Sequence, residues 1–353
     1  MKGSDLTVDV WCDVVLCGGV VGVVSTLLHL LGLSCCTSTL LFLSLWALSS
    51  AVCILLPSLK VSPAGKTVLI TGCDTGFGFS LALHLDKLGF RVVAGCLDVE
   101  SDGAKKLKRS GSSRLTVLNL DVTSSAQLTT TANALKDIIP TGEVLWGLVN
   151  NAGVSTFGEV EWVSDNTFRK LLEVNTLGTI AATKAFLPFI RRAQGRVVNI
   201  SSMYGRMSNT MRSPYVTSKY AVEGFTDCLR QDMRAWGVKV CLLEPGNFVA
   251  ATYINTVENV KKAGEAMWAG MDEDLKQDFP RHYFDSKVNQ MVSFAKCGSS
   301  DGGPVIDAMT AALMEKYPRS RYLPMDGVTR VRVAVATLLP SWVYDWVYAS
   351  THR

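Results

Sequence analysis

The chain has 353 residues, enough for one large domain or two smaller ones, and only 19% of them are charged. A net charge of +4 without a long basic run argues against a nucleic-acid partner. The ten cysteines form no Cys-x-x-Cys pair, and the four histidines are scattered. We therefore predict no metal site, and reduced thiols in an intracellular compartment.

The first segment is strongly apolar, since residues 14–59 contain no Lys, Arg, Asp or Glu. Two runs, 14–33 and 40–56, are each about long enough to cross a hydrocarbon core of roughly 30 Å. We predict that residues 1–59 form a membrane anchor rather than a buried hairpin, with two spans or with one span and an interfacial helix. Three aspartates against one lysine in the first thirteen residues fit neither a secretory signal nor a mitochondrial presequence. Lys60 and Lys66 place the following domain on the cytoplasmic or matrix side.

A strand, a glycine-rich turn and a helix follow in direct succession. The strand is predicted at 66–71 and the helix at 79–88. Glycines let a backbone approach a pyrophosphate closely, and a helix N-terminus favours its negative charge. This context predicts a dinucleotide site formed by the turn residues Gly72, Asp74, Thr75, Gly76, Phe77 and Gly78.

Strands and helices then alternate along the chain. Further strands are predicted at 91–96, 115–120, 144–149, 195–200, 238–243 and 321–323, with helices at 103–109, 124–138, 214–236 and 307–317 and two long helical segments before residue 195. This order predicts an α/β fold, a Rossmann-type doubly wound parallel sheet in a single catalytic domain at 60–327 behind the anchor. Ligands bind at the carboxyl ends of such strands. One crevice is therefore expected to collect Gly72, Asp121, Asn150, Ser202 and Pro245.

A serine, a tyrosine and a lysine suggest the chemistry. Tyr215 and Lys219 are four residues apart on a predicted helix and share one face, while Ser202 follows a predicted strand. A neighbouring ammonium lowers the pKa of a phenol, which makes it a usable acid or base for an alcohol oxygen. The pair Tyr283 and Lys287 has the same spacing but lacks the serine and the strand, so spacing alone does not identify a site.

Residues 66–326 resemble the short-chain dehydrogenase/reductase family. The matching motifs are Thr71-Gly72-x-x-x-Gly76-x-Gly78, Asn150-Asn151-Ala152-Gly153, Asn175 after Glu-Val, Ser202, Tyr215-x-x-x-Lys219 and Pro245-Gly246. The resemblance implies that Tyr215 is the acid/base, Lys219 lowers its pKa, Ser202 orients the substrate oxygen and Asn175 holds a water of a proton relay. It also implies further cofactor contacts from Asp98, Asp121, Val122, Asn151, Ala152, Gly153, Tyr215, Lys219, Pro245, Gly246 and Phe248.

The phrases around the glycine turn, Ser155–Glu161 and Glu244–Phe248 are similar to the D-beta-hydroxybutyrate dehydrogenase branch of that family. This implies an NAD-dependent oxidoreductase that interconverts (R)-3-hydroxybutanoate and acetoacetate. Cys96 stands where an acid usually binds the adenosine ribose, and Asp98 is expected to replace it. No Lys or Arg occupies 96–98, which favours NAD over NADP. Ala250 stands where the family commonly has a threonine after the Pro-Gly pair, and Thr252 is expected to serve in its place.

The substrate side leaves alternatives open. A hydroxybutyrate carboxylate needs a cation near Ser202, and Arg206 or Arg212 could supply one. Tyr204 beside Met203, Met207 and Met211 could instead border an apolar pocket. A membrane-anchored retinol or 17-beta-hydroxysteroid dehydrogenase is therefore the second hypothesis, and a catalytically silent dinucleotide-binding scaffold the third. Residues 253–297 fall where the family places its substrate lid.

The remaining expectations concern location and partners. The aromatic tail at 328–353 suits either a membrane interface or packing against the domain. The resemblance implies a mitochondrial inner membrane, whereas the N-terminal sequence fits the endoplasmic reticulum. A small-molecule alcohol or ketone, a lipid membrane and a second copy of the chain are the expected partners.

Overall fold

A computed structural model describes residues 5–32, 34–252 and 256–349, so residues 253–255 of the expected lid lie outside the described residues. The chain divides into two compact units. The hairpin unit comprises residues 1–62 with 314–319, and the sheet unit comprises residues 63–313 with 320–353. The tail expected at 328–353 is thus part of the sheet unit.

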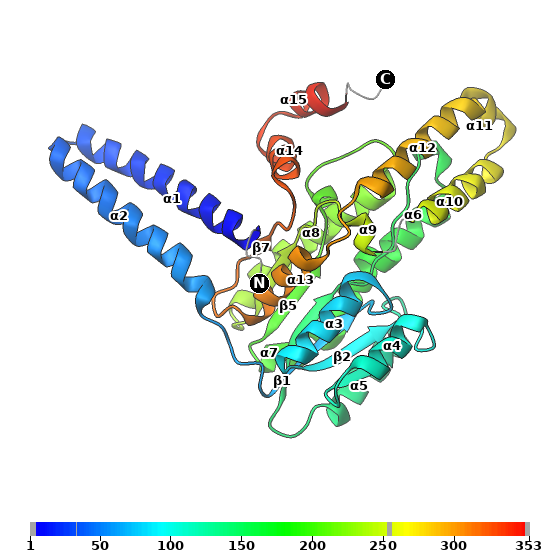
Figure 1. The fold of residues 1–353 in the computed structure, drawn as a ribbon, viewed down its shortest axis with the longest axis horizontal. Coiled ribbons are helices and arrows are strands. Elements are labelled where there is room, and N and C mark those ends of the chain that lie inside the picture. Colours follow the sequence, from blue (N-terminus) through cyan, green and yellow to red (C-terminus); the bar gives the residue numbers. More distant parts are fainter. Residues whose placement is uncertain (1–4, 33, 253–255, 350–353) are drawn as a thin grey trace. The chain divides into compact units, whose positions relative to one another are not determined.

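Two antiparallel helices, α1 (Asp5–Leu30) and α2 (Cys35–Leu55), form the hairpin unit (Figure 1). A side chain on Gly18 would collide with the indole of Trp46, whose N–H donates to the carbonyl of Val14 at 3.0 Å. The absence of a side chain there lets the two helices pack closely. Within the described residues, one helical segment, Cys36–Ser58, is long enough and apolar enough to cross a membrane. The apolar part of α1, Val14–Leu30, is shorter.

The sheet unit is built on seven parallel strands in the order β3-β2-β1-β4-β5-β6-β7. The sequence-based prediction of a doubly wound parallel sheet is confirmed. The strands are β1 (Lys66–Thr71), β2 (Arg91–Cys96), β3 (Leu115–Asn119), β4 (Val144–Asn150), β5 (Arg196–Ile200), β6 (Lys239–Leu243) and β7 (Arg321–Tyr322). The order reverses between β1 and β4, where ligands bind in this class of fold.

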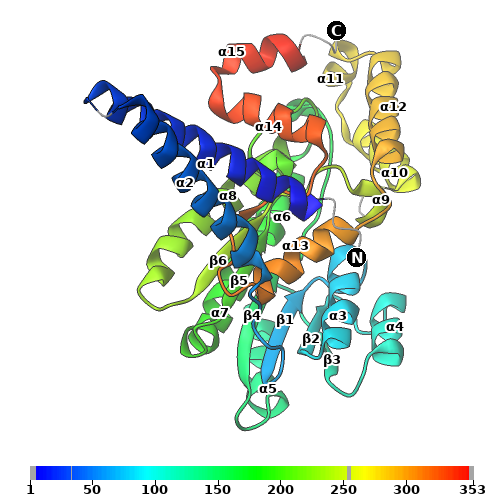
Figure 2. The same cartoon turned by 60° about the vertical axis from the view of Figure 1, so that its left-hand side comes forward.

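Apolar side chains alternate between the two faces of the sheet. Leu69 and Leu148 join a core with α5 (Ser125–Ile138), α7 (Thr179–Arg192) and α8 (Ser213–Arg234). Their neighbours Val68 and Gly147 face the other way, where Leu313 of α13 (Gly303–Met314) approaches. Helix α3 (Gly76–Leu88) lies beside α13 on that face (Figure 2). Both faces are therefore covered, as near-continuous apolar strands require.

The other elements extend from the carboxyl edge of the sheet or complete its flanks. Helix α12 packs against α10 around Trp162 and Phe284 in a second apolar cluster. In the tail, the Tyr344 hydroxyl donates to the carbonyl of Ser208 at 2.8 Å, so part of the tail packs on the domain. These elements are α4 (Asp102–Ser110), α6 (Asp165–Leu172), α9 (Val249–Thr252), α10 (Val257–Gly270), α11 (Glu273–Asp278), α12 (Arg281–Cys297), α14 (Gly327–Leu338) and α15 (Ser341–Tyr344).

A π-helical turn lies close to the expected site. Between α6 and α7, residues Glu173–Gly178 form a π-helix that contains Asn175. Such turns insert one extra residue into a helix and occur often at functional sites. Here α6 packs on α8, whereas α7 packs mainly on β4 and only to a smaller extent on α8. The π turn therefore joins two helices that pack on different neighbours.

Candidate active site

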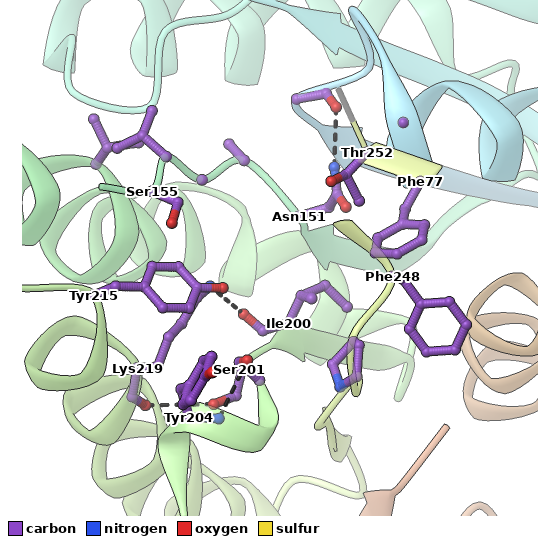
Figure 3. Close-up of a pocket in the computed structure, with 18 of the residues that line it drawn as sticks. Phe77, Asn151, Ser155, Ile200, Ser201, Tyr204, Tyr215, Lys219, Phe248 and Thr252 are labelled. Carbon is purple, nitrogen blue, oxygen red and sulfur yellow. Dashed lines mark hydrogen bonds between the residues drawn. The ribbon is translucent and has the colours of Figure 1, made fainter. Parts of the chain in front are cut away.

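A cavity of about 560 Å³ opens at the carboxyl ends of the strands (Figure 3). It brings together most of the residues that the sequence suggested. Those that line it are Gly72, Asp74, Thr75, Gly76, Phe77, Asp121, Val122, Asn151, Ala152, Gly153, Ser202, Tyr204, Arg212, Tyr215, Lys219, Pro245, Gly246, Phe248 and Thr252. Five residues proposed from the sequence do not line it, namely Gly78, Asp98, Asn150, Asn175 and Arg206.

The glycine turn is fitted tightly to the end of β4. Gly72 has φ +70°, and a Cβ on it would lie 2.7 Å from Cα of Ala152. A Cβ on Gly78 would lie 2.3 Å from the carbonyl oxygen of Gly72 and 2.6 Å from Nδ2 of Asn151. That amide nitrogen donates to the carbonyls of Thr71 at 3.0 Å and of Gly72 at 2.9 Å. The turn thus presents bare backbone at the N-terminus of α3, a cradle that suits a pyrophosphate.

The two acids near the second strand have different positions. The Asp74 carboxylate accepts hydrogen bonds from the backbone N–H groups of Leu97 at 2.9 Å and Asp98 at 3.1 Å. Asp74 therefore fixes the loop after β2. The Asp98 carboxylate accepts a hydrogen bond from the N–H of Glu100 at 2.8 Å and does not line the cavity. The neighbouring residue Leu97 lines the cavity instead. The expected contact of Asp98 with a ribose gains no support from this arrangement.

Helix α8 carries the tyrosine and the lysine into the cavity beside the end of β5 (Figure 3). The ammonium of Lys219 donates to the carbonyl of Ile200 at 2.9 Å and lies 5.6 Å from the centroid of the Tyr215 ring. Burial lowers the pKa of Lys219 to about 8, and the charge of Glu223 opposes this shift. Lys219 is buried and Tyr215 is half-buried, so neither is fully solvated in its charged form.

The pKa of Tyr215 differs from the expectation that Lys219 lowers it. Burial raises this pKa above its ordinary value, against opposing effects of the Ser202 hydroxyl and of the Arg212 charge. Desolvation of the phenolate therefore outweighs the nearby cations in this site. The cation that acts most clearly on Tyr215 is Arg212, which the sequence suggested only as a substrate contact.

Asn175 lies behind the cavity wall. Its Oδ1 accepts from the N–H of Val154 at 2.8 Å, and its Nδ2 donates to Ser218 Oγ and to the Val154 carbonyl, both at 2.9 Å. Ser218 precedes Lys219 in α8. Asn175 thus joins the strand β4 loop to the helix of the lysine.

Arg212 and Arg206, which the sequence could not separate, occupy different places. Arg212 is 3% exposed and lines the cavity, with its guanidinium over the rings of Phe294 at 4.8 Å and Tyr204 at 5.8 Å. Its guanidinium donates to the Thr156 carbonyl at 3.4 Å and lies against Tyr204, and no acidic side chain in the described part of the chain pairs with it. Burial lowers its pKa. Arg206 lies outside the cavity lining.

Some lining residues were not singled out from the sequence. Ser155 and Val154 follow the Asn-Ala-Gly motif, whereas Phe294 reaches the cavity from α12, far along the chain. No spacing could have indicated Phe294. The expectation that Asn150 lines the crevice is wrong, because its Nδ2 points into the sheet and donates to Thr183 Oγ1 at 2.9 Å and Asn199 Oδ1 at 2.8 Å.

The pair Tyr283 and Lys287 lies away from the cavity. The Tyr283 hydroxyl donates to the Glu159 carboxylate at 2.7 Å on the exposed side of α12. Tyr283 therefore makes a structural contact with Glu159. The missing serine had already indicated that this pair is not a catalytic site.

The profile of the short chain dehydrogenase family matches residues 66–261. The chain belongs to this family. Solved short-chain dehydrogenases share its fold. A Streptomyces avermitilis enzyme is 25% identical at a TM-score of 0.61, covering 81% of this chain and 94% of its own. A Burkholderia phymatum enzyme in complex with NAD is 23% identical at a TM-score of 0.64, covering 78% and 94%.

Two classes of animal short-chain dehydrogenase are similar over most of the chain. Bovine mitochondrial D-beta-hydroxybutyrate dehydrogenase is 50% identical over 294 residues, which cover 82% of this chain and 86% of the relative. Mouse retinol dehydrogenase 7 is 40% identical over 257 residues, or 73% and 79%. This short-chain dehydrogenase is therefore an oxidoreductase with a small-molecule substrate, and the relatives indicate association with an intracellular membrane.

Proposed function

We propose that the protein is an NAD-dependent dehydrogenase that transfers a hydride between (R)-3-hydroxybutanoate and NAD, with acetoacetate as the product. Identity of 46–50% to the bovine, mouse and rat D-beta-hydroxybutyrate dehydrogenases supports this substrate. The retinol dehydrogenases are less similar, at 39–41%.

The observation that carries the proposal is the buried, acid-free position of Arg212. A guanidinium that is 3% exposed has lost most of its water, and no described carboxylate replaces that water. Burying a charge without a partner is costly, so the site favours an anion that enters with the substrate. The carboxylate of hydroxybutanoate can accept two parallel hydrogen bonds from such a group. Its hydroxyl then lies toward Ser202 and Tyr215.

The side chains of the cavity can manage the proton of the alcohol. Ser202 holds the substrate oxygen, and the Tyr215 oxygen takes the hydroxyl proton as the carbonyl forms. The Ser202 hydroxyl and the charge of Arg212 stabilise the phenolate that burial disfavours. Asn175 fixes the backbone between β4 and α8, and we propose that this geometry holds the relay to solvent.

The cofactor residues fit a dinucleotide, because the glycine cradle leaves no room for a Cβ. Gly72 to Phe77 would hold the pyrophosphate, Asp121 and Val122 the adenine side, and Ala152, Lys219 and Phe248 the nicotinamide side. When bound, NAD accepts the hydride from the alcohol carbon. The 2′-phosphate of NADP would need a cation beside the adenosine ribose, but the apolar Leu97 lines this part of the cavity. This supports NAD over NADP.

An apolar alcohol is the second candidate. Met203, Phe248 and Phe294 line the same cavity as Tyr204, and a retinoid or steroid could pack on them. Such a substrate would leave Arg212 unpaired. We therefore rank it below hydroxybutanoate.

The test compares two arginine variants of the full chain in lipid vesicles. Arg212→Gln removes the charge in the cavity, and Arg206→Gln is the matched control outside it. Loss of a charge-assisted hydrogen bond costs about 1.5–3 kcal/mol, so R212Q should raise KM for (R)-3-hydroxybutanoate about 10- to 150-fold. R206Q should change KM less than threefold. Rapid oxidation of retinol or a 17-beta-hydroxysteroid by the wild type, without turnover of hydroxybutanoate, would refute the proposal.

We further propose that α2 anchors the protein in an intracellular membrane, with the sheet unit on the cytoplasmic or matrix side, and that the chain forms a homo-oligomer. The mitochondrial relatives support the inner mitochondrial membrane, and the retinol dehydrogenases leave the endoplasmic reticulum as the alternative. Exposed Trp342 and Trp346 in the tail suit contact with the lipid headgroups.

A further inference from the structure

A cluster of carboxylates lies behind the lysine, on the side away from the cavity. Glu223 follows Lys219 by one helical turn of α8, and Glu244 directly follows strand β6, just before Pro245. Glu223 is 7% exposed and Glu244 1% exposed. Neither residue touches the cavity, and the chemistry proposed above does not use them.

One arginine serves both buried acids. Nη1 of Arg321 pairs with Glu223 Oε2 and also with Glu244 Oε1 at 2.5 Å, while its Nη2 pairs with Asp227 at 2.6 Å. Asp227 is far more exposed than the other two and also pairs with Arg230 at 3.1 Å. Two buried negative charges around one guanidinium nitrogen repel each other strongly, because the surroundings are poor in water.

One carboxylate oxygen of this cluster is left over. Glu223 Oε1 is buried and has no cation as a partner within the described residues, although the Ser201 side chain beside it lowers the pKa of Glu223 against the effect of burial. It lies against Gly205 together with Ser201 Oγ, since a Cβ on that glycine would meet both atoms at 2.6 and 2.4 Å. The Ser201 hydroxyl donates in turn to the Lys219 carbonyl at 3.4 Å. This oxygen has no cation of its own, so full ionisation of both buried acids is poorly compensated.

Electrostatics agree with this geometry. Burial, and then the charge of Glu223, raises the pKa of Glu244 to about 7, and burial raises the pKa of Glu223. The charge of Glu223 also opposes the lowering of the Lys219 pKa. The charged and titratable groups that face Glu223 are Lys219, Tyr220 and Asp227 on α8, Arg206 after β5, Glu244 after β6 and Arg321 on β7.

We propose that Glu223 and Glu244 share one proton beside Arg321 at neutral pH, and that the negative charge remaining on Glu223 keeps Lys219 in its ammonium form. Glu223 is thus a positioning residue that acts on the reaction through the lysine. The inference rests on the roles proposed above for Tyr215 and Lys219. It goes beyond them because it places the control of the lysine charge outside the cavity.

Two variants should move the pH profile in opposite directions. Glu223→Gln removes the supporting charge, so the alkaline limb of kcat/KM for alcohol oxidation should shift down by about one pH unit. At pH 8, that shift lowers the ammonium fraction from about one half to about one tenth. Glu244→Gln removes the neighbouring negative charge that raises the pKa of Glu223, so Glu223 ionises fully and the limb should shift upward. Asp227→Asn, which alters the exposed partner of Arg321, is the control that should leave the limb in place.

The outcomes separate this inference from the proposed function. NADH binding and thermal unfolding are measured first, to establish that each variant is folded. A shift of E223Q no larger than that of D227N overturns the inference, as does a wild-type profile without an alkaline limb. If E223Q does not fold, E244Q decides, because a downward shift there means that both acids are ionised in the wild type. Turnover that survives Tyr215→Phe refutes the proposed acid/base role instead.

Discussion

The fit of the glycine turn predicts a large effect from a single methyl group at position 78. In Gly78→Ala, the new Cβ would lie 2.3 Å from the Gly72 carbonyl oxygen and 2.6 Å from Asn151 Nδ2. Real Cβ atoms do not approach other atoms so closely, so the turn must move away from β4. Overpacking of this kind costs about 1–3 kcal/mol. The movement also strains the two hydrogen bonds of Asn151, each worth about 1 kcal/mol.

The assay is a fluorescence titration with NADH, combined with urea unfolding. G78A should bind NADH at least about tenfold more weakly. If about 1.4 kcal/mol of the strain opposes the conformation that binds NADH, Kd rises about tenfold. The control is Gly224→Ala in α8, where the added Cβ has no neighbour within 4 Å. The control should bind NADH normally and be as stable as the wild type or slightly more so. Normal NADH affinity and normal stability in G78A would show that the cradle reasoning is mistaken.

Two further predictions concern the catalytic side chains. Tyr215→Phe should lower turnover at least 100-fold but leave NADH binding within twofold, as measured by initial rates and fluorescence, since only a proton-transferring hydroxyl is lost. Lys219 has a pKa of about 8 when folded against an ordinary value of 10.5, so the unfolded chain binds more protons between these pH values and the wild type gains stability as pH rises through them. Lys219→Met should therefore be more stable than the wild type by roughly 2 kcal/mol at pH 7, once the loss of the hydrogen bond to Ile200 is subtracted. This advantage should disappear above pH 10.5. An equal gain in stability at both pH values, measured by urea unfolding, would contradict the expected direction of the pH dependence.

The sequence was sufficient for much of the fold because the apolar strands are short and clearly bounded. β1 and β2 have the limits that the apolar runs predicted, and β5 begins one residue later than predicted. The helix after the glycine turn begins at Gly76, three residues earlier than expected. Its first turn is made by the same glycines that the sequence suggested for the cofactor, and glycine has little propensity for helix.

The site was harder to predict where direction and burial decide. Asn150 ends a strand as expected, but it is the residue whose side chain turns into the sheet, while Asn151 turns toward Gly72. Arg206 and Arg212 could not be separated, because their distinction depends on which one the lid residue Phe294 covers. Contacts between such distant segments leave no local spacing in the sequence.

The π turn at Glu173–Gly178 should make this helix intolerant of insertions and deletions. Removing one residue would restore regular helical winding but would rotate everything on one side of the turn by about 100° relative to the other. The face of α6 that meets α8 and the face of α7 that meets β4 would then no longer point at their neighbours together. Length changes should therefore be excluded from this segment during divergence, even where side chains are exchanged freely. Alignments of related chains can use this turn as a fixed reference point.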